Sequence, residues 1–347
     1  MKKSLITLAV LATSGAAMAQ SSVQLIGRID ASLARHTSEV TGYSPVASLS
    51  QTQLDDSNMQ TSYWGMTGSE DLGGGLKTNF TLMSAFNVDT GSAPAGNTLF
   101  EREAHVGLAG GFGEVMLGRF YTPYHDASTA DEMTGDMNYS VWFPVSSLSI
   151  GRNELRSSNG IRYNTPVYNG FSGAASYAFG ENKNTAANVG NATDQVTMNV
   201  KYDTGPLMLI YGHDQEKQMQ ASLATAQDTK KFDTFGGTYD FGIAKLYASY
   251  QKSTLALQKT TAEQFGVDVP VSAAAKIQFG YAKGKNTGQA FDLNADGFVL
   301  AGTYDLSKRT QLYAVYNSTK IDSVDASNLG VDTTKASLLA AGVRHLF

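Results

Sequence analysis

The sequence has no cysteine, no long apolar run and no excess of basic residues, and each absence excludes a class of protein. Without cysteine there is neither a disulfide framework nor thiol catalysis. After the N-terminal segment no stretch approaches about 18 consecutive apolar residues, so no transmembrane helix is expected. The formal net charge of −5 excludes the broad basic surface that binds nucleic acid, so we expect no nucleic-acid partner.

The N-terminal segment is typical of a secretory signal peptide. Lys2 and Lys3 give it a basic start, a short apolar stretch follows, and Ala19 fits the rule that small residues precede the cleavage site. The apolar stretch is too short to span a membrane stably. We therefore expect residues 1–19 to be removed and residues 20–347 to form one domain.

The rest of the chain alternates in hydrophobicity with a period of two. In residues 195–203 the even positions are apolar or aromatic and the odd positions are polar, and residues 171–179 and 244–251 have the same period. Alternation over segments of about ten residues is typical of a membrane barrel with an apolar outside and a wet lumen. A soluble sandwich also alternates, so this pattern alone leaves both folds open.

Short turns and long loops follow one another in strict alternation. The tight connections are residues 70–75, 110–113, 168–170, 204–206, 240–242, 272–275 and 305–309. The expected long loops are residues 35–58, 88–99, 120–157, 181–193, 217–230, 254–264, 285–290 and 319–335. These connections join about sixteen strands, with both termini on the short-turn side. The sequence therefore predicts an all-β fold, a closed antiparallel transmembrane β-barrel in which no strand edge is left open.

Aromatic residues gather beside the short turns, where a girdle at the membrane interface is expected. They are Phe112, Tyr168, Phe171, Tyr202, Tyr239, Phe241, Tyr304 and Phe347. The last of them ends the chain, on one face with Val343 and His345 of an alternating segment. A terminal aromatic residue on the closing strand of a barrel would face lipid at the membrane edge.

Seven segments together resemble the general porins of Gram-negative bacteria, of the β-proteobacterial type. They are residues 22–31, 68–77, 100–108, 117–123, 156–163, 304–310 and 342–347. The resemblance spans the mature chain and implies a sixteen-stranded homotrimeric channel in the outer-membrane lipid, which passes small hydrophilic solutes and ions. It also implies that the barrel-assembly machinery recognises the terminal Phe347, and that the third long loop, residues 120–157, folds into the lumen.

The resemblance further implies that acids of the third loop face a ladder of cations on the pore wall. The loop acids are Asp126, Asp131, Glu132 and Asp136, and the wall candidates are Arg28, Lys77, Arg102, Arg156 and Arg162. Opposed charges would set a transverse field across the narrowest point, which orders water and disfavours apolar solutes. The alternative for the acids is a solvated surface run.

Strand phase predicts the direction of four of the wall candidates. Alternation points Arg28 and Arg162 into the lumen. Lys77 lies beside a turn, so lumen and bulk solvent are both open to it. Arg102 shares a phase with apolar neighbours and would point outward, unless a bulge or a position above the membrane intervenes.

The chain departs from the family pattern at wall positions. Tyr63 and Thr67 stand where lumenal cations are usual, and Met83 stands where an acid is common. Because two cations are lost and the chain is acidic, we expect weak ion selectivity with cations slightly favoured. Salt should screen this preference, since the Debye length is about 10 Å at 0.1 M.

No motif indicates a metal, a cofactor or an enzyme. Residues 292–297 begin like a calcium loop, but Thr303 occupies the place of the bidentate glutamate. The histidines have no metal-binding spacing, and no nucleophile, histidine and acid are grouped for catalysis. We therefore expect a passive diffusion channel, the alternative being a solute-specific channel of the same fold with a binding site at the constriction.

Overall fold

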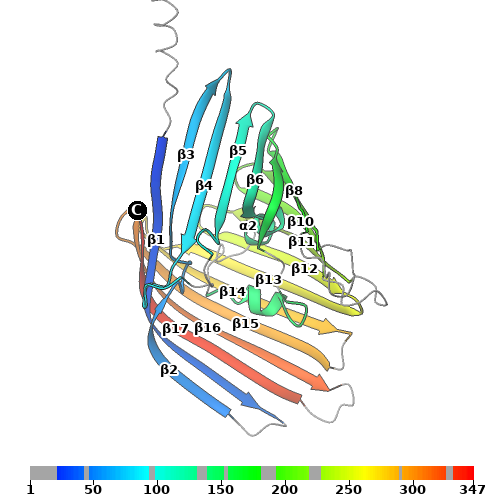
Figure 1. Ribbon diagram of the computed structural model, residues 1–347. Coiled ribbons are helices and arrows are strands. Elements are labelled where there is room, and N and C mark those ends of the chain that lie inside the picture. The colour runs from blue at the N-terminus through cyan, green and yellow to red at the C-terminus, as the bar shows by residue number, and fades with distance from the viewer. Residues whose placement is uncertain are drawn as a thin grey trace, which may run out of the picture.

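The chain forms a ring of antiparallel strands with two short helices inside it (Figure 1). The computed structural model describes residues 22–42, 47–93, 98–130, 139–151, 155–180, 193–218, 228–288, 291–325 and 331–347. The helices are α2 (Pro123–Ala130) and α3 (Trp142–Ser146). The strands are β1 (Ser22–Thr41), β2 (Ala47–Asp56), β3 (Tyr63–Gly73), β4 (Leu76–Ala85), β5 (Glu103–Gly110), β6 (Gly113–Tyr121), β7 (Arg156–Asn164), β8 (Phe171–Ala178), β9 (Gln195–Asp203), β10 (Leu207–Lys217), β11 (Thr229–Asp240), β12 (Lys245–Leu255), β13 (Gln258–Pro270), β14 (Ala275–Thr287), β15 (Phe291–Asp305), β16 (Thr310–Asp325) and β17 (Val331–Leu346).

The ring is closed because the first strand pairs with the last. β1 pairs with β17 along one edge, and along its other edge it pairs first with β3 and then with β2. β2 and β3 therefore occupy one place in the ring and are separated by residues 57–62. The seventeen strand segments fill sixteen places, which confirms the predicted closed barrel of about sixteen strands. Neither helix of the described chain is long and apolar enough to cross a membrane.

The tight turns lie where the sequence predicted them, and three of the long loops do not. All seven predicted turns join consecutive strands; in one of them Asn169 and Gly170 take positive φ angles of 49° and 83°. The predicted loops 35–58, 254–264 and 319–335 were wrong, because most of their residues extend β1, β2, β13, β16 and β17. These segments are polar because they rise above the apolar band, yet the hydrogen-bonded pairing of the strands continues through them.

Along each strand, apolar side chains face outward and polar side chains face the lumen. On β9, Val196 and Met198 are each 42% exposed on the outside, whereas Thr197 between them is fully buried on the inside. The predicted alternation is thus confirmed, and it separates the barrel from a soluble sandwich. An exposed apolar exterior around a polar interior is what a membrane barrel requires.

Two aromatic rows border the apolar exterior. The predicted row lies beside the short turns, where Phe171 and Tyr202 have ring centroids 4.6 Å apart. The second row, which the sequence analysis missed, lies toward the opposite strand ends and includes Tyr177, Tyr211, Tyr250, Tyr281, Phe298 and Tyr316. Two such rows define the edges of a membrane-facing band.

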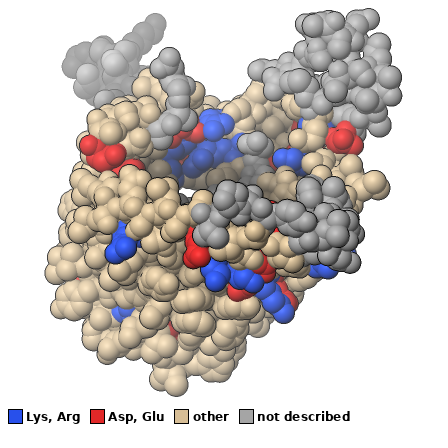
Figure 2. Space-filling view, turned by 90° about the horizontal axis from the view of Figure 1, so that it is seen from below, with Lys and Arg blue, Asp and Glu red and all other residues tan. Residues whose placement is uncertain are grey.

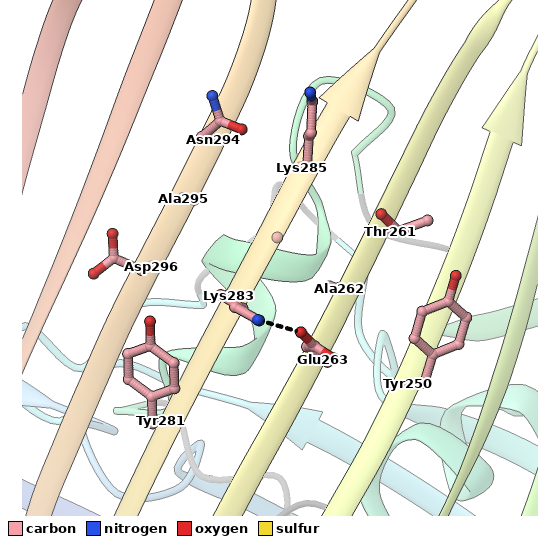
Figure 3. Close-up of a pocket in the computed structure, with 11 residues that line it drawn as sticks. Tyr250, Thr261, Ala262, Glu263, Tyr281, Lys283, Lys285, Asn294, Ala295 and Asp296 are labelled. Atoms are coloured by element: carbon pink, nitrogen blue, oxygen red, sulfur yellow. Dashed lines mark ion pairs between the residues drawn. The ribbon is translucent and has the colours of Figure 1, made fainter.

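A row of charges crosses the outer face directly beyond the second aromatic row. Pairing places Glu263, Lys283, Asp296 and Lys320 side by side on β13 to β16. The Nζ atom of Lys283 is 2.6 Å from an Oε atom of Glu263, and both side chains are more than half exposed (Figure 3). Opposite charges at neighbouring cross-strand positions support the pairing where the barrel leaves the apolar band.

The two helices and the residues around them pack against the inner wall. Tyr139, Trp142 and Val145 form one buried cluster with small wall residues of β13 to β15, among them Ala262, Ala282 and Ala295. Glycine permits this close approach: a Cβ on Gly212 would stand 2.6 Å from the Cβ of Ala127 in α2, and one on Gly284 would stand 2.5 Å from the carbonyl oxygen of Val145. The described parts of the third loop therefore lie on the lumen side of the strands.

Candidate functional site in the barrel lumen

Four arginines from four parts of the chain meet on the inner wall. Arg28 comes from β1, Arg102 from the residue just before β5, Arg156 from the start of β7 and Arg344 from β17. We call them the arginine cluster. Figure 2 shows Lys and Arg side chains gathered along one wall of the central opening. Their convergence follows from barrel closure, which brings the first and last strands together beside β3 to β7.

Two tyrosine rings connect members of the arginine cluster. The guanidinium carbons of Arg28 and Arg102 lie 5.0 and 5.3 Å from the centroid of the Tyr63 ring. The Tyr121 ring lies 4.2 Å from the guanidinium carbon of Arg156, and its hydroxyl accepts hydrogen bonds from both Arg102 and Arg156. Each cation–π contact contributes about 0.5–2 kcal/mol, so the rings hold like charges near one another.

One amide oxygen joins Arg28 to Arg344, the fourth arginine of the cluster. The Oε1 atom of Gln60 accepts a hydrogen bond of 2.7 Å from Nη1 of Arg28 and one of 2.6 Å from Nη1 of Arg344. Arg28 also donates from Nε to the backbone oxygen of Thr61 at 3.0 Å. Among the described residues, the acceptors of Arg28 and Arg344 are therefore neutral groups, which do not compensate the two positive charges.

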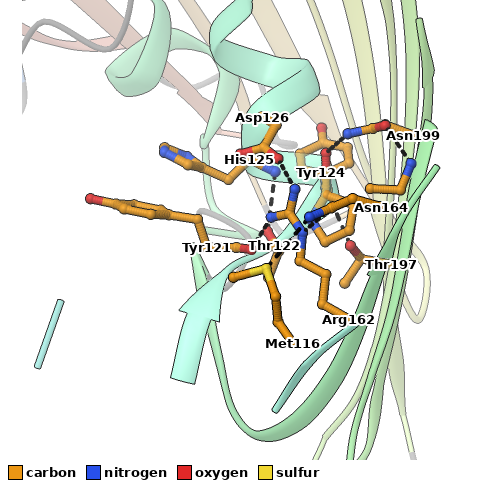
Figure 4. A network of polar contacts seen from close by, with 12 residues as sticks. Met116, Tyr121, Thr122, Tyr124, His125, Asp126, Arg162, Asn164, Thr197 and Asn199 are labelled. Atoms are coloured by element: carbon orange, nitrogen blue, oxygen red, sulfur yellow. Dashed lines mark hydrogen bonds and ion pairs between the residues drawn. The ribbon is translucent and has the colours of Figure 1, made fainter. Parts of the chain in front are cut away.

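Arg162 on β7 lies beside Tyr121, whose ring contacts the cluster, and it is neutralised by the third loop (Figure 4). Its Nη2 atom is 2.5 Å from Oδ2 of Asp126 in α2, and its Nη1 donates to the backbone oxygen of Tyr121 at 2.6 Å. Partial burial raises the pKa of the Asp126 carboxyl, and the charge of Arg162 opposes that rise. This ion pair ties the first helix of the loop to the wall.

Two further hydrogen bonds attach α2 to the same wall. The backbone N–H of Tyr124 donates to Oγ1 of Thr197 at 3.2 Å, and Nδ2 of Asn199 donates to the backbone oxygen of Pro123 at 2.7 Å. Both wall residues are lumen-facing polar residues of β9. The inward polar face of the strands thus holds the loop in place as well as contacting water.

The structure brings together only part of the predicted site. Arg28, Arg102, Arg156 and Arg162 lie in or beside the cluster, whereas Lys77 is exposed at the turn end of β4 and has none of these contacts. Arg102 precedes β5 instead of continuing its alternation, so the outward phase does not apply to it. Among the loop acids, Asp126 pairs with Arg162. The other three, Asp131, Glu132 and Asp136, lie outside the described residues.

Sequence reasoning missed Arg344, Gln60 and the roles of both tyrosines. A signal for Arg344 was present, because Val343, His345 and Phe347 alternate outward and so leave the arginine facing inward. Tyr63 was noted only as a lost cation, although its ring holds two other cations. Gln60 lies in the interruption between β2 and β3, and no periodicity in the sequence marks that interruption.

The charge balance of the cluster is strongly positive among the described residues. None of its four arginines forms an ion pair with an acid among the residues that the structure describes. Four guanidinium groups on one wall of a water-filled opening would attract anions and repel cations.

Replacing Asp126 with asparagine should loosen the third loop. A hydrogen bond to a charged group contributes about 1.5–3 kcal/mol, so the variant should show noisier single-channel current and more frequent closures. Planar-bilayer recording checks this. Asp203→Asn is the matched control, because Asp203 forms a looser pair with Lys201, at 3.6 Å, at the exposed end of β9. Equal noise in both variants would contradict an anchoring role for Asp126.

The closed barrel with a charged lumen defines the class of the protein, a channel-forming outer-membrane β-barrel. A family model described as Gram-negative porin matches residues 6–323. The outer membrane porin protein 32 of Delftia acidovorans is 36% identical over 353 residues, which cover 99% of this chain and 95% of that protein. The chain therefore belongs to the Gram-negative porin family.

Two solved structures have the same fold. The anion-selective porin from Comamonas acidovorans matches with a TM-score of 0.77 and 29% identity, covering 94% of this chain and all of that one. The trimer form of OmpT of Vibrio cholerae matches with a TM-score of 0.66 and 17% identity, covering 94% of this chain and 99% of that one, and shares the fold alone. The family places this protein in the outer membrane as a channel for small solutes, and not as an enzyme.

Proposed function

We propose that this porin is a passive diffusion channel that favours small anions, with the arginine cluster as the charged wall of its constriction. The observation that supports this is the meeting of four arginines that form no ion pair with an acid among the described residues, while the one described acid of the third loop, Asp126, is already paired with Arg162. The sign is opposite to the slight cation preference expected from the sequence. The solved relative from Comamonas, named as anion-selective, supports the same direction.

The reversal potential in a potassium chloride gradient tests this proposal. At about 0.1 M salt we expect chloride to permeate at least about threefold better than potassium, because wall charges about one Debye length from the axis remain effective. The ratio should fall toward one as salt rises to about 1 M, where the Debye length is about 3 Å. A ratio that favours potassium at low salt would overturn the proposed sign.

A solute-specific channel is the second candidate, supported by the multiple guanidinium donors gathered in one place. Guanidinium groups bind carboxylates with paired hydrogen bonds, so a carboxylate solute would be the preferred ligand. Saturable conductance that a small dicarboxylate blocks in competition with chloride would favour this candidate. Conductance that increases linearly with chloride and is indifferent to the dicarboxylate favours passive diffusion.

We further propose that three copies assemble through the sector of β17, β1 and β2. The second aromatic row includes Phe298 on β15. Across the following strands, the positions paired in turn with Phe298 are small polar residues without rings that would anchor in lipid, namely Ser318, Ser337, Thr37 and Ser50. Small side chains permit a neighbouring barrel to approach closely. Cross-linking of single cysteines placed at Ser337 should give covalent dimers, the largest product that one thiol per copy allows, and native mass spectrometry should give a trimer; a monomer in native mass spectrometry would contradict the proposal.

The N-terminal leader and the assembly signal complete the proposal. Residues 1–19 are removed on export, so the mature chain begins at Gln20, and intact-mass measurement of the purified protein checks this. Phe347 is the residue that the barrel-assembly machinery recognises.

A further inference from the structure

The interruption between β2 and β3 is tied to β1 by a single residue, Asp30. The backbone oxygen of Asp30 accepts from the N–H of Ser57 at 2.9 Å, and its N–H donates to Oγ of Ser62 at 3.0 Å. Ser57 takes a positive φ of 62°, which turns the chain out of the strand. The two ends of the segment of residues 57–62 are thus held at one place on β1.

The carboxylate of Asp30 fixes the middle of the same segment. One of its oxygens accepts from the N–H groups of Met59 and Gln60, at 2.7 and 2.6 Å, and the other accepts from the hydroxyl of Tyr313 at 2.7 Å. Asp30 and Met59 are both fully buried, and Met59 packs in the cluster that contains Trp142 of the third loop. Because the carboxylate is occupied by neutral donors, it forms no ion pair with the nearby arginines among the described residues.

This arrangement determines where the Gln60 side chain goes. With its N–H held by Asp30, Gln60 extends its amide oxygen between Arg28 and Arg344, 2.7 and 2.6 Å from their Nη1 atoms. Two guanidinium groups that share one acceptor would normally gain from a carboxylate there, since its negative charge would add the attraction of an ion pair to both hydrogen bonds. The chain has the neutral isostere of glutamate at this position, so both positive charges stay available to the lumen.

We propose that Gln60 is a selectivity-determining residue of the channel and that Asp30 is its positioning residue. Gln60 holds Arg28 and Arg344 at one point of the wall without cancelling their charge. Asp30 holds the segment that carries Gln60. This inference rests on the proposed function, since it explains how the anion preference is maintained.

The first test exchanges Gln60 for glutamate, a change of charge at nearly constant shape. In Gln60→Glu the permeability ratio of chloride to potassium should fall about twofold or more, the effect of one unit charge across about 8 Å of water. Gln51→Glu is the matched control, because Gln51 lies on the adjoining β2, is exposed and has no hydrogen bond to an arginine among the described residues. The control should move the ratio by less than half as much.

The second test asks whether Asp30 acts through Gln60. In an Asp30→Ala background, the shift caused by Gln60→Glu should shrink to that of the Gln51→Glu control, because the glutamate is no longer held between the two arginines. Asp30→Asn should preserve the full shift, since its amide oxygen still accepts from both N–H groups and its NH₂ can donate to Tyr313. If Asp30→Ala does not assemble, Tyr313→Phe removes one of the three hydrogen bonds to the carboxylate and should give a smaller loss of the same sign.

The outcomes separate this inference from the proposed function. If the unmodified channel favours potassium but Gln60→Glu still shifts the ratio more than Gln51→Glu, the proposed sign fails and the role of Gln60 stands. If the unmodified channel favours chloride and the two glutamate variants shift it equally, the role of Gln60 is overturned. A full Gln60→Glu shift in the Asp30→Ala background overturns the positioning role of Asp30 alone.

Discussion

Deletion of Phe347 is expected to lower the amount of barrel in the outer membrane by at least about tenfold, because two hydrogen bonds at about 1 kcal/mol each are lost at the seam together with the packing of the ring over Gly27. The backbone N–H of Phe347 donates to the oxygen of Gly27 at 3.0 Å, and its oxygen accepts from the N–H of Gly27 at the same distance. The ring lies over that glycine, where an added Cβ would come within 2.1 Å of it. Phe347 therefore closes the ring of strands directly against β1.

Three variants divide this effect into its parts. Phe347→Ala keeps the backbone hydrogen bonds and loses the ring, Phe347→Tyr keeps both, and Leu300→Ala removes an exposed outward side chain from β15, outside the proposed trimer interface. We expect outer-membrane levels to rank with Tyr and the Leu300 control near normal, Ala reduced, and the deletion lowest. Heat-modifiable mobility of the membrane fraction measures folded barrel. A normal level of the truncated chain would show that neither the seam nor the assembly signal depends on Phe347.

Replacement of Arg28 with glutamine should shift the reversal potential toward potassium, by about twofold in the permeability ratio at 0.1 M salt. Arg28 contacts both Gln60 and the Tyr63 ring, so it lies at the centre of the cluster. Arg35→Gln is the matched control: the same change on the same strand, at an exposed side chain of opposite phase that donates to Ser50. The control should leave the ratio unchanged.

The same pair of variants tests whether the wall or the whole chain sets the selectivity. Both substitutions change the net charge equally, so equal shifts would mean that the cluster has no special place in the pore. A shift confined to Arg28→Gln that vanishes near 1 M salt would locate the effect on the lumen wall. Raising the salt thus acts as a second control within one experiment.

Most of the barrel could be predicted because each part of it leaves a local signal. Alternation in residues 195–203 predicts a strand with one face toward water and one toward lipid. The glycine of a turn such as Asn169-Gly170 predicts a residue with a positive φ. The failed loops show the limit of this signal. Above the membrane both faces of a strand meet water, so residues 319–325 on β16 have a polar composition that a loop would share.

The candidate site was less predictable, because its members come from distant parts of the chain. Strand phase was enough to predict that Arg28 and Arg162 face inward, and it would have been enough to predict the same for Arg344. It could not show that Arg28 and Arg344 share one acceptor, since they are more than 300 positions apart in the sequence. The slight cation preference was expected from the acidic net charge and from two wall positions, Tyr63 and Thr67, that lack the usual cations, and neither of these shows where the remaining arginines meet.

The sequence by itself determined the barrel, its outward and inward faces, its turns and its family, because period-two hydrophobicity and turn chemistry act within a few residues. Only the tertiary structure decided the arrangement of charge in the lumen. Closure of β1 on β17 brought the arginines together, two tyrosine rings held them, and the interruption anchored by Asp30 placed a neutral oxygen between two of them. A field in a pore depends on distances between charges, and those distances exist only once the ring has closed.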